Sequence, residues 1–341
     1  MTTSKKTFLS INFGCRVNSA ETNQWSQTLI DRGFVPTKSN PDIILINTCS
    51  ITKKGETESL GTIRHFHQLY PQAQIFATGC ANLNKVKDLT NLTIISNDQK
   101  EKLLEKLESN YTHQIKDKFS HTHRFLLKVQ SGCSQFCSYC IVPSKRPKLF
   151  SLPISKAVST VKKAVRDGYQ EVVITGVNLD QYQYGFSNLV QSLLQETDIK
   201  LISFGSIPIN CLDQKFIDLL KKYPDRLSYF LHIPIQSGSD KILKLMHRPY
   251  TSKDILQKIR NLNLEIRNLK FGTDIIVGFP TENHQDFQKT LKLCQKINFS
   301  KIHVFKYSPR PNTQARMLFE NSPKISKVVL KSRSQQIRNL I

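Results

Sequence analysis

The sequence is short of acidic residues and has no long apolar run. It contains 26 Asp and Glu residues against 49 Lys and Arg residues, which gives a formal net charge of +23. No stretch approaches the roughly 18 apolar residues that a membrane-spanning helix needs, and the first residues lack the apolar core of a signal peptide. We therefore expect a cytoplasmic protein with no membrane partner. The positive charge favours a nucleic-acid partner, although a biased composition alone could also produce it.

Eight cysteines stand in a chain that we expect to stay in a reducing compartment. Cysteines in such a compartment more often bind metals or take part in catalysis than form disulfides. The 341 residues, of which 39% are hydrophobic and 22% charged, suffice for two folded domains.

The first hundred residues alternate strand-like and helix-like segments. Asn18 with Glu21 predicts an N-cap pair for a helix that ends near Asp31. Strands separated by helices imply right-handed βαβ units, so the fold class is α/β, with an open parallel sheet in an N-terminal domain over residues 1–107. The expected strands are Thr7–Phe13, Asp42–Asn47 and Gln74–Thr78.

A polar segment, residues 108–124, reads as a linker, and the alternation resumes after it. Six βα units over residues 125–322 predict a partial (β/α)6 barrel, three-quarters of the eight-fold version. Residues 323–341 predict a basic C-terminal helix. The expected barrel strands are Phe125–Gln130, Glu171–Thr175, Leu201–Ser206, Leu227–Pro234, Gly272–Val277 and Lys301–Tyr307.

The segment directly after the first barrel strand carries the pattern Cys-x-x-x-Cys-x-x-Cys, formed by Cys133, Cys137 and Cys140. A four-iron cubane normally takes four cysteine ligands, so three ligands leave one iron open to S-adenosylmethionine. Electron transfer into its sulfonium group would then give a 5′-deoxyadenosyl radical. The alternative is a zinc knuckle, which prefers four Cys or His ligands, and no matching fourth ligand lies nearby in the sequence.

Three further cysteines are scattered in sequence but share one context. Cys15, Cys49 and Cys80 each follow the carboxyl end of a predicted strand. Because such ends lie along one edge of a parallel sheet, the three thiols can meet at one point and form a second metal site. The alternative is three inert, buried cysteines. Cys211 and Cys294 lie in or beside helical patterns and are interpreted as structural.

Both cysteine sets together resemble the methylthiotransferase family of radical S-adenosylmethionine enzymes. The resemblance covers nearly the whole chain. The motifs that carry it are Gly14-Cys-Arg-Val-Asn18, Asn47-Thr-Cys49, Thr78-Gly-Cys80, Gly132 to Pro143, Thr175-Gly-Val-Asn178, His232 to Ser239, Thr273 to Pro280 and His303 to Pro309.

The resemblance implies two [4Fe-4S] clusters and S-adenosyl-L-methionine as cofactors, with an auxiliary cluster on Cys15, Cys49 and Cys80 that binds or donates sulfur. It implies tRNA as the partner and a reduced flavodoxin- or ferredoxin-type electron donor. It also places a set of residues near S-adenosylmethionine at one end of the barrel: Tyr139, Gly176, Asn178, Gln236, Ser237 and Gly278.

Residues Gly14 to Thr22 and His303 to Ser308 are similar to the MtaB type, which acts on N6-threonylcarbamoyladenosine just 3′ of the anticodon. The alternatives are a MiaB-type enzyme acting on N6-isopentenyladenosine and a non-catalytic RNA-binding iron–sulfur protein derived from the family. The chain departs from the family pattern at Arg146-Pro147, Ser151-Leu152, Ser203 to Ile209 and Thr281.

The family usually carries a C-terminal TRAM domain that grips RNA, and we expect it to be absent here. Phosphate contacts would then come from the two basic domains and from cationic residues near the C-terminus: Lys324, Lys327, Lys331, Arg333 and Arg338.

Overall fold

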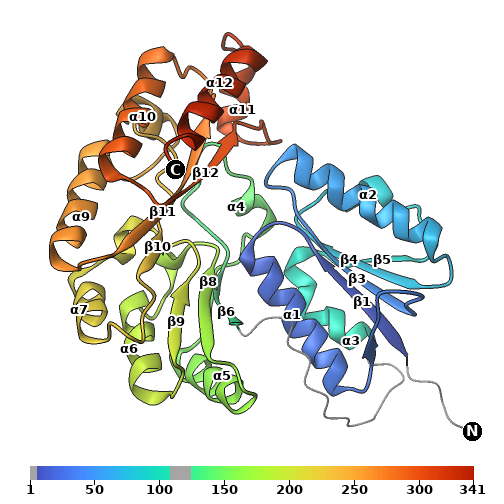
Figure 1. Cartoon of the computed structure of the whole chain (residues 1–341). Helices are drawn as coiled ribbons and strands as arrows, with labels where there is room; N and C mark the ends of the chain where they lie inside the picture. The colour runs from blue at the N-terminus through green and yellow to red at the C-terminus, as the bar shows by residue number, and fades with distance from the viewer. Residues whose placement is uncertain (1–5, 108–123) are drawn as a thin grey trace, which may run out of the picture.

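The computed structural model describes residues 6–107 and 124–341, which fold as two α/β domains (Figure 1). Residues 108–123 of the predicted linker lie outside the described residues, and Arg124 already opens the first strand of the second domain. In the described part of the chain, no helix is long and apolar enough to cross a membrane.

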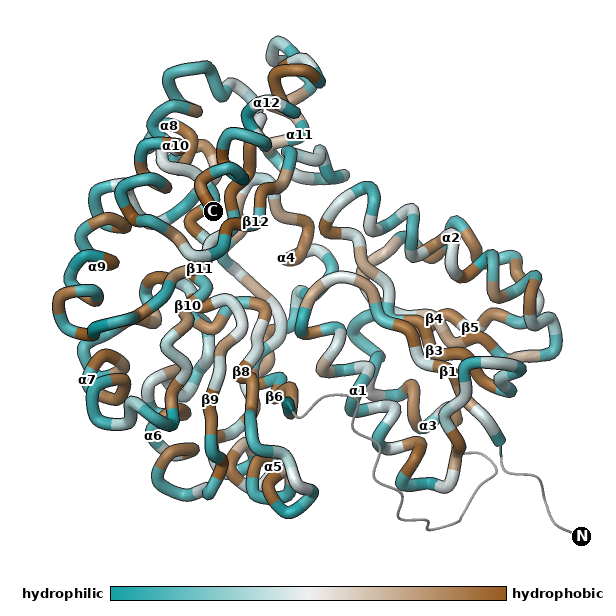
Figure 2. The backbone as a smooth tube through the Cα atoms, viewed as in Figure 1, coloured by the Kyte–Doolittle hydropathy of each residue, from teal (hydrophilic) through white to brown (hydrophobic). Residues whose placement is uncertain are grey.

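The N-terminal domain is a parallel sheet of five strands in the order β2-β1-β3-β4-β5. Every residue of β3 is buried, because helices and loops cover both faces of this central strand. Figure 2 shows the matching hydrophobic colour along β3 and β4. The strands are β1 (Thr7–Asn12), β2 (Val35–Pro36), β3 (Ile43–Thr48), β4 (Gln74–Gly79) and β5 (Leu92–Ile94), and the helices are α1 (Arg16–Asp31), α2 (Lys53–Leu69), α3 (Leu103–Leu107), η1 (Leu83–Val86) and η2 (Asn97–Lys102).

The predicted N-cap pair at the start of α1 is wrong. The helix begins at Arg16 with Cys15 as its N-cap, and no side chain makes the capping hydrogen bond. Asn18 and Glu21 instead lie within the helix and are 1% and 3% exposed, respectively. Their side chains are buried because they bind groups from other parts of the chain, described below.

The second domain is the expected partial barrel. Its six parallel strands fall into two ladders, β6-β8-β9 and β10-β11-β12, and isolated bridges from Ile202 to Leu227 and from Ser206 to His232 join β9 to the β10 segment. The strands are β6 (Arg124–Ser131), β8 (Glu171–Gly176), β9 (Leu201–Phe204), β10 (Phe230–His232), β11 (Lys270–Val277) and β12 (Lys301–Lys306), with a short antiparallel strand, β7 (Phe150–Ser151), beside β6.

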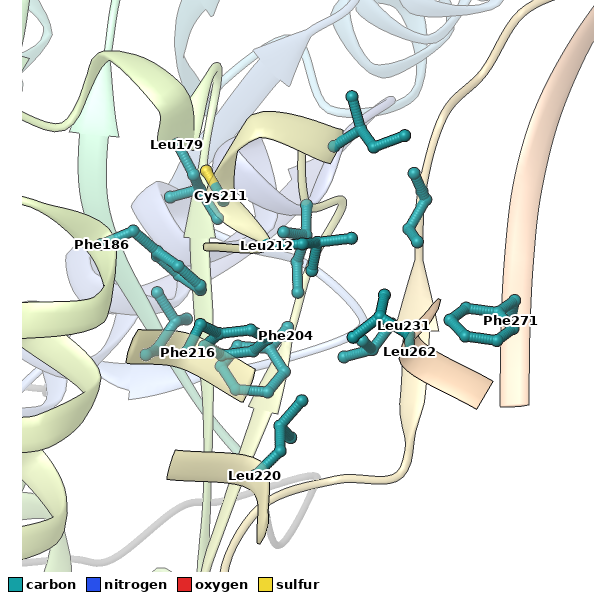
Figure 3. Packing of buried hydrophobic residues seen from close by; sticks show 14 of the residues in the cluster. Leu179, Phe186, Phe204, Cys211, Leu212, Phe216, Leu220, Leu231, Leu262 and Phe271 are labelled. Carbon is teal, nitrogen blue, oxygen red and sulfur yellow. The ribbon is translucent and has the colours of Figure 1, made fainter. Parts of the chain in front are cut away.

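Most helices of this domain lie on the outer side of the barrel strands, whereas α4 lies between the two domains (Figure 1). Alternate strand residues and the apolar faces of the helices form the main core, in which Phe186, Phe204 and Phe216 pack edge to face or tilted (Figure 3). The α-helices are α4 (Val142–Lys145), α5 (Ile154–Arg166), α6 (Phe186–Glu196), α7 (Gln214–Lys222), α8 (Asp240–Leu245), α9 (Ser252–Glu265), α10 (His284–Ile297), α11 (Gln314–Glu320) and α12 (Lys327–Arg338); the 3-10 helices are η3 (Leu179–Gln181) and η4 (Ile209–Cys211).

Strand β10 is shorter than the expected Leu227–Pro234. Only Phe230–His232 pairs with β11 as a ladder, and the chain then turns through Pro234, which has no backbone N–H to donate.

Helix α12 is the predicted C-terminal helix, and it packs beside β12 and α10. Arg333 was expected to be exposed and to contact RNA phosphates, but its side chain is not at the surface. It is buried and donates from Nη1 to the Glu282 side chain at 2.5 Å. Lys324, Lys327, Lys331 and Arg338 remain exposed.

Candidate active site

Cys133, Cys137 and Cys140 lie together in the loop between β6 and α4. Gly132 opens the loop at φ +82°, and a Cβ there would lie 2.2 Å from the Lys148 carbonyl oxygen, so only glycine fits. The Ser138 backbone N–H donates to the Met246 carbonyl at 3.2 Å, and its hydroxyl donates to the Leu245 carbonyl at 2.6 Å. These bonds hold the loop against the end of α8.

Burial, with smaller contributions from the nearby Cys137 and Cys133 thiols, raises the pKa of the Cys140 thiol to about 12. Two N–H groups from outside the loop point at this trio of sulfurs. Arg248 Nη1 lies 3.4 Å from Cys137 Sγ, and Asn178 Nδ2 lies 3.6 Å from Cys133 Sγ. Donors of this kind stabilise thiolates that ligate a metal.

Cys15, Cys49 and Cys80 also converge, at the carboxyl edge of the N-terminal sheet. They directly follow the loop after β1, the end of β3 and the end of β4, respectively. A Cβ on Gly14 would lie 2.4 Å from Cys49 Sγ, so the first cysteine loop passes tightly over the second. Burial raises the pKa of Cys49 to about 11, with further contributions from the Cys80 and Cys15 thiols.

The number of thiols at each site bears on which metal group they could hold. A four-iron cubane held by three cysteines keeps one iron open to another ligand, whereas a structural zinc ion normally takes four Cys or His ligands. In the described part of the chain, the close group of ligand atoms suited to a single metal ion is that of His232, Asp274 and His303, and neither cysteine trio belongs to it.

A buried ionic network joins the two domains beside these cysteines. Arg146, just after α4, binds Glu21 of α1 through two hydrogen bonds of 2.8 and 2.9 Å. Lys100 and Lys128 contact the same carboxylate at 2.7 and 3.2 Å. Burial would raise the pKa of Glu21, but the hydrogen bonds from Arg146 and the three positive charges hold it well below its usual range. Burial lowers the pKa of Lys100 to about 8.

The network lies beside Cys15 and Cys80 and directly follows the Cys133 loop in sequence. Arg146 lies close enough to Cys80 and Cys15 for these thiols to raise its pKa further. Asn97 of η2 contacts both sides: its Nδ2 donates to the Lys145 carbonyl at 2.7 Å and lies 3.7 Å from Cys80 Sγ. The stretch that follows the Cys133 loop therefore packs directly against the Cys80 region.

The six residues expected near S-adenosylmethionine lie in the Cys133 loop or where barrel strands end. Asn178 contacts a cluster cysteine, as described. Ser237 is 1% exposed, and its hydroxyl pairs with Thr290 Oγ1 at 3.2 Å, so this side chain is engaged within the protein. Gly278 turns at φ +78° under Leu330. The remaining three are Tyr139, Gly176 and Gln236. Tyr139 packs against a small apolar cluster formed by Ile242, Met246, Phe279 and Ala315. Gly176 ends β8, and Gln236 has a positive φ of +69°. Their contact with the cofactor stays a prediction.

Sequence reasoning missed Arg248, Asn97 and the role of Glu21. Each acts at long range in sequence, and no local spacing marks it. The pairing of Asn18 with Glu21 three residues later resembled a helix cap, which concealed their contacts with Arg146.

Comparison with protein families divides the chain in the same way. Residues 127–294 match the model of the radical SAM superfamily, and residues 7–97 match that of the Uncharacterized protein family UPF0004. A threonylcarbamoyladenosine tRNA methylthiotransferase MtaB of Aquifex aeolicus (strain VF5) is 32% identical over 96% of this chain and 86% of its own length. The chain belongs to the radical S-adenosylmethionine methylthiotransferase family. Membership implies S-adenosylmethionine and a [4Fe-4S] cluster, for which Cys133, Cys137 and Cys140 supply fitting ligands.

Other members of this family are similarly close. A tRNA-2-methylthio-N(6)-dimethylallyladenosine synthase of Thermodesulfovibrio yellowstonii (strain ATCC 51303 / DSM 11347 / YP87) is 33% identical over 90% of this chain and 77% of its own length. Among solved structures, the radical S-adenosylmethionine methyltransferase TsrM from Kitasatospora setae, with cobalamin and a [4Fe-4S] cluster bound, superimposes with a TM-score of 0.67. It covers 99% of this chain and 91% of its own, at 12% identity. This likeness supports the fold alone.

Proposed function

We propose that this enzyme is a tRNA methylthiotransferase of MtaB type, which adds a methylthio group to C2 of N6-threonylcarbamoyladenosine just 3′ of the anticodon. The observation that carries the proposal is the convergence of two cysteine trios in two domains that the Glu21–Arg146 contact joins. The similarity to MtaB relatives supports the choice of nucleoside, and the net charge of +23 suits an RNA substrate.

In this proposal Cys133, Cys137 and Cys140 hold the cluster that faces S-adenosylmethionine, and Cys15, Cys49 and Cys80 hold a second [4Fe-4S] cluster. When bound, these groups supply an electron, a carbon-centred radical that removes hydrogen from the substrate, and the sulfur to be transferred. A reduced flavodoxin- or ferredoxin-type protein supplies the electron from outside.

The residues of the chain position and tune these groups. Arg248 and Asn178 donate to thiolate sulfurs and so favour their charged, metal-bound form. Arg146 and Lys128 of the barrel domain bind Glu21 of the N-terminal domain and so fix the two domains in one relative placement, which a transfer between two separate sites requires. Tyr139, Gly176, Gln236, Ser237 and Gly278 line the strand ends where we place S-adenosylmethionine.

A MiaB-type reaction on N6-dimethylallyladenosine is the second candidate, and the 33% identity to such an enzyme favours it. Anaerobic protein, reductant and S-adenosylmethionine should be incubated with tRNA carrying either nucleoside, and the digested nucleosides analysed by mass spectrometry. We expect methylthiolated N6-threonylcarbamoyladenosine. Methylthiolation of the dimethylallyl nucleoside alone would replace the proposal with the second candidate.

A further inference from the structure

Three polar side chains meet on neighbouring barrel strands, apart from both cysteine trios. Asp274 Oδ1 of β11 lies 2.9 Å from His232 Nε2 of β10 and 3.2 Å from His303 Nδ1 of β12. The strand register places Asp274 directly beside His303. The two imidazole rings are 5.1 Å apart.

These side chains point to the inside of the barrel. Residues that alternate with them, Ile275 of β11 and Ile302 of β12, belong to the core shared with the outer helices. In a strand, successive side chains point to opposite faces, so Asp274 and His303 face away from those helices. Of the residues expected near S-adenosylmethionine, Gln236 and Ser237 follow β10 and Gly278 follows the carboxyl end of β11.

Exposure rises steadily across the group. The side chains of His232, Asp274 and His303 are 9%, 21% and 47% exposed. His232 is held from behind, because a Cβ on Gly272 would lie 2.7 Å from its Nδ1, so only glycine leaves it room. The His232 ring is therefore fixed within the barrel, whereas the His303 ring is accessible to another molecule.

The hydrogen bonds leave one atom of His303 unused. Its Nδ1 points at Asp274, which as a carboxylate only accepts, so Nδ1 carries the proton in a neutral ring and Nε2 has the lone pair. No described residue makes a hydrogen bond with that Nε2. An aspartate that orients an imidazole in this way prepares its second nitrogen to meet another molecule.

An exposed aromatic ring lies on the same face of β12 as His303. Phe305 is two residues further along β12, on the same face as His303, and it is 43% exposed. Bases that a protein takes out of an RNA stack are commonly received on an aromatic face of this kind.

We propose that His303 and Phe305 form the subsite for the N6-substituted adenine, an inference that rests on the proposed function. Phe305 stacks on the purine, and His303 Nε2 accepts a hydrogen bond from an N–H or O–H group of the substituent. A threonylcarbamoyl group offers a second N–H and a hydroxyl beyond the N6–H, whereas a dimethylallyl group offers neither. Asp274 and His232 position His303.

Two histidines and one carboxylate could instead hold a divalent metal ion, since such a trio is a known metal-binding set. The experiment must therefore separate a hydrogen-bonding subsite from a metal site. It should also separate failure of this inference from failure of the proposed function.

The test compares anticodon stem-loop RNAs with threonylcarbamoyladenosine, dimethylallyladenosine or adenosine at the target position. Binding to anaerobic holoenzyme is measured by fluorescence anisotropy, and methylthiolation by single-turnover assay. The variants are His303→Ala, His303→Gln, which keeps an acceptor, and Phe305→Ala. His284→Ala, an exposed histidine on α10, is the matched control.

We expect wild type to prefer the threonylcarbamoyl RNA and His303→Ala to lose about tenfold of that preference, the effect of about one hydrogen bond. His303→Gln should restore part of it, and Phe305→Ala should weaken binding of all three RNAs. Iron content and visible absorption of the variants should match wild type, which excludes misfolding as the cause.

An unchanged preference in His303→Ala, with wild type still methylthiolating the threonylcarbamoyl RNA, would overturn the inference and leave the proposed function standing. Wild type that modifies only the dimethylallyl RNA would overturn the proposed function instead. About one non-iron metal ion per chain, present in wild type and lost in His303→Ala, would replace the subsite with a metal site.

Discussion

The Arg146 guanidinium and the Glu21 carboxylate face each other with two parallel hydrogen bonds, Nη1 to Oε1 at 2.8 Å and Nη2 to Oε2 at 2.9 Å. Arg146 comes from the barrel domain and Glu21 from the N-terminal domain. The paired geometry is the strongest form of a carboxylate–guanidinium contact. Since Arg146 follows one cysteine loop and lies near Cys15 and Cys80, this contact sets how the two sites lie relative to each other.

Replacement of Glu21 by Gln should destabilise the protein strongly. The change leaves the charges of Arg146 and Lys100 buried without a counter-charge, and breaking a buried ion pair in this way costs about 3–5 kcal/mol. We expect the free energy of unfolding, measured by urea denaturation of anaerobic protein at pH 7, to fall by that amount. Glu58→Gln, which removes an exposed partner of Lys54, is the control and should change it by less than about 1 kcal/mol. Equal effects of the two changes would contradict the role given to Glu21.

The contribution of the Glu21 network to the free energy of unfolding should decrease at acid pH. Because the pKa of Glu21 is lower in the folded chain than its ordinary value of 4.5, the network stabilises the fold above pH 4.5 and loses this contribution as the pH falls further. The difference in unfolding free energy between wild type and Glu21→Gln should therefore shrink between pH 5 and pH 3. Acid also strips iron from both proteins, so the difference between them is the informative quantity. A constant difference over that range would show that Glu21 is not held ionised.

Replacement of Gly14 by Ala should disrupt the N-terminal site selectively. The new Cβ would lie 2.4 Å from Cys49 Sγ, in a backbone conformation that alanine disfavours. We expect iron at Cys15, Cys49 and Cys80 to be lost while the Cys133 site keeps its iron. Gly61→Ala in α2 is the matched control, since nothing lies within 4 Å of its Cβ position. That change should leave iron content intact and stabilise the helix by about 0.5–1 kcal/mol. Full iron content in Gly14→Ala would show that the two loops can separate.

Replacement of Arg248 by Leu should lower the reduction potential of the cluster held by Cys133, Cys137 and Cys140. The N–H group 3.4 Å from Cys137 Sγ, together with its positive charge, favours the reduced, more negative cluster. We expect a negative shift on the order of 50 mV, since about 59 mV corresponds to a tenfold change for a one-electron couple. Redox titration followed by electron paramagnetic resonance measures it, with Arg260→Leu on α9 as the control. An unchanged potential would reduce Arg248 to a packing role.

The sequence predicted the frame of the molecule well, because alternation of apolar strands and helices is a local signal. The three cysteines after β1, β3 and β4 could be grouped from sequence, since parallel strands end at one edge. Boundaries were less certain where pairing is sparse: β10 was overextended, and β7 was missed because two residues have no periodicity.

Contacts between distant segments could not be predicted from local pattern. Glu21 and Arg146 lie 125 positions apart, and Cys137 and Arg248 lie 111 apart. The group of His232, Asp274 and His303 draws one residue from each of three strands, so only the register of the folded barrel brings them together. From the sequence, Arg333 is indistinguishable from the exposed cations around it, and only the folded structure shows that it pairs with Glu282.

The central claim is that each trio of cysteines holds its own cluster, and iron and sulfide counts per chain test it most directly. Protein purified without oxygen should contain about eight iron and eight sulfide ions. Cys137→Ala and Cys49→Ala should each retain about four, with the remaining cluster visible by spectroscopy. About four irons in wild type, or zinc in their place, would contradict the claim.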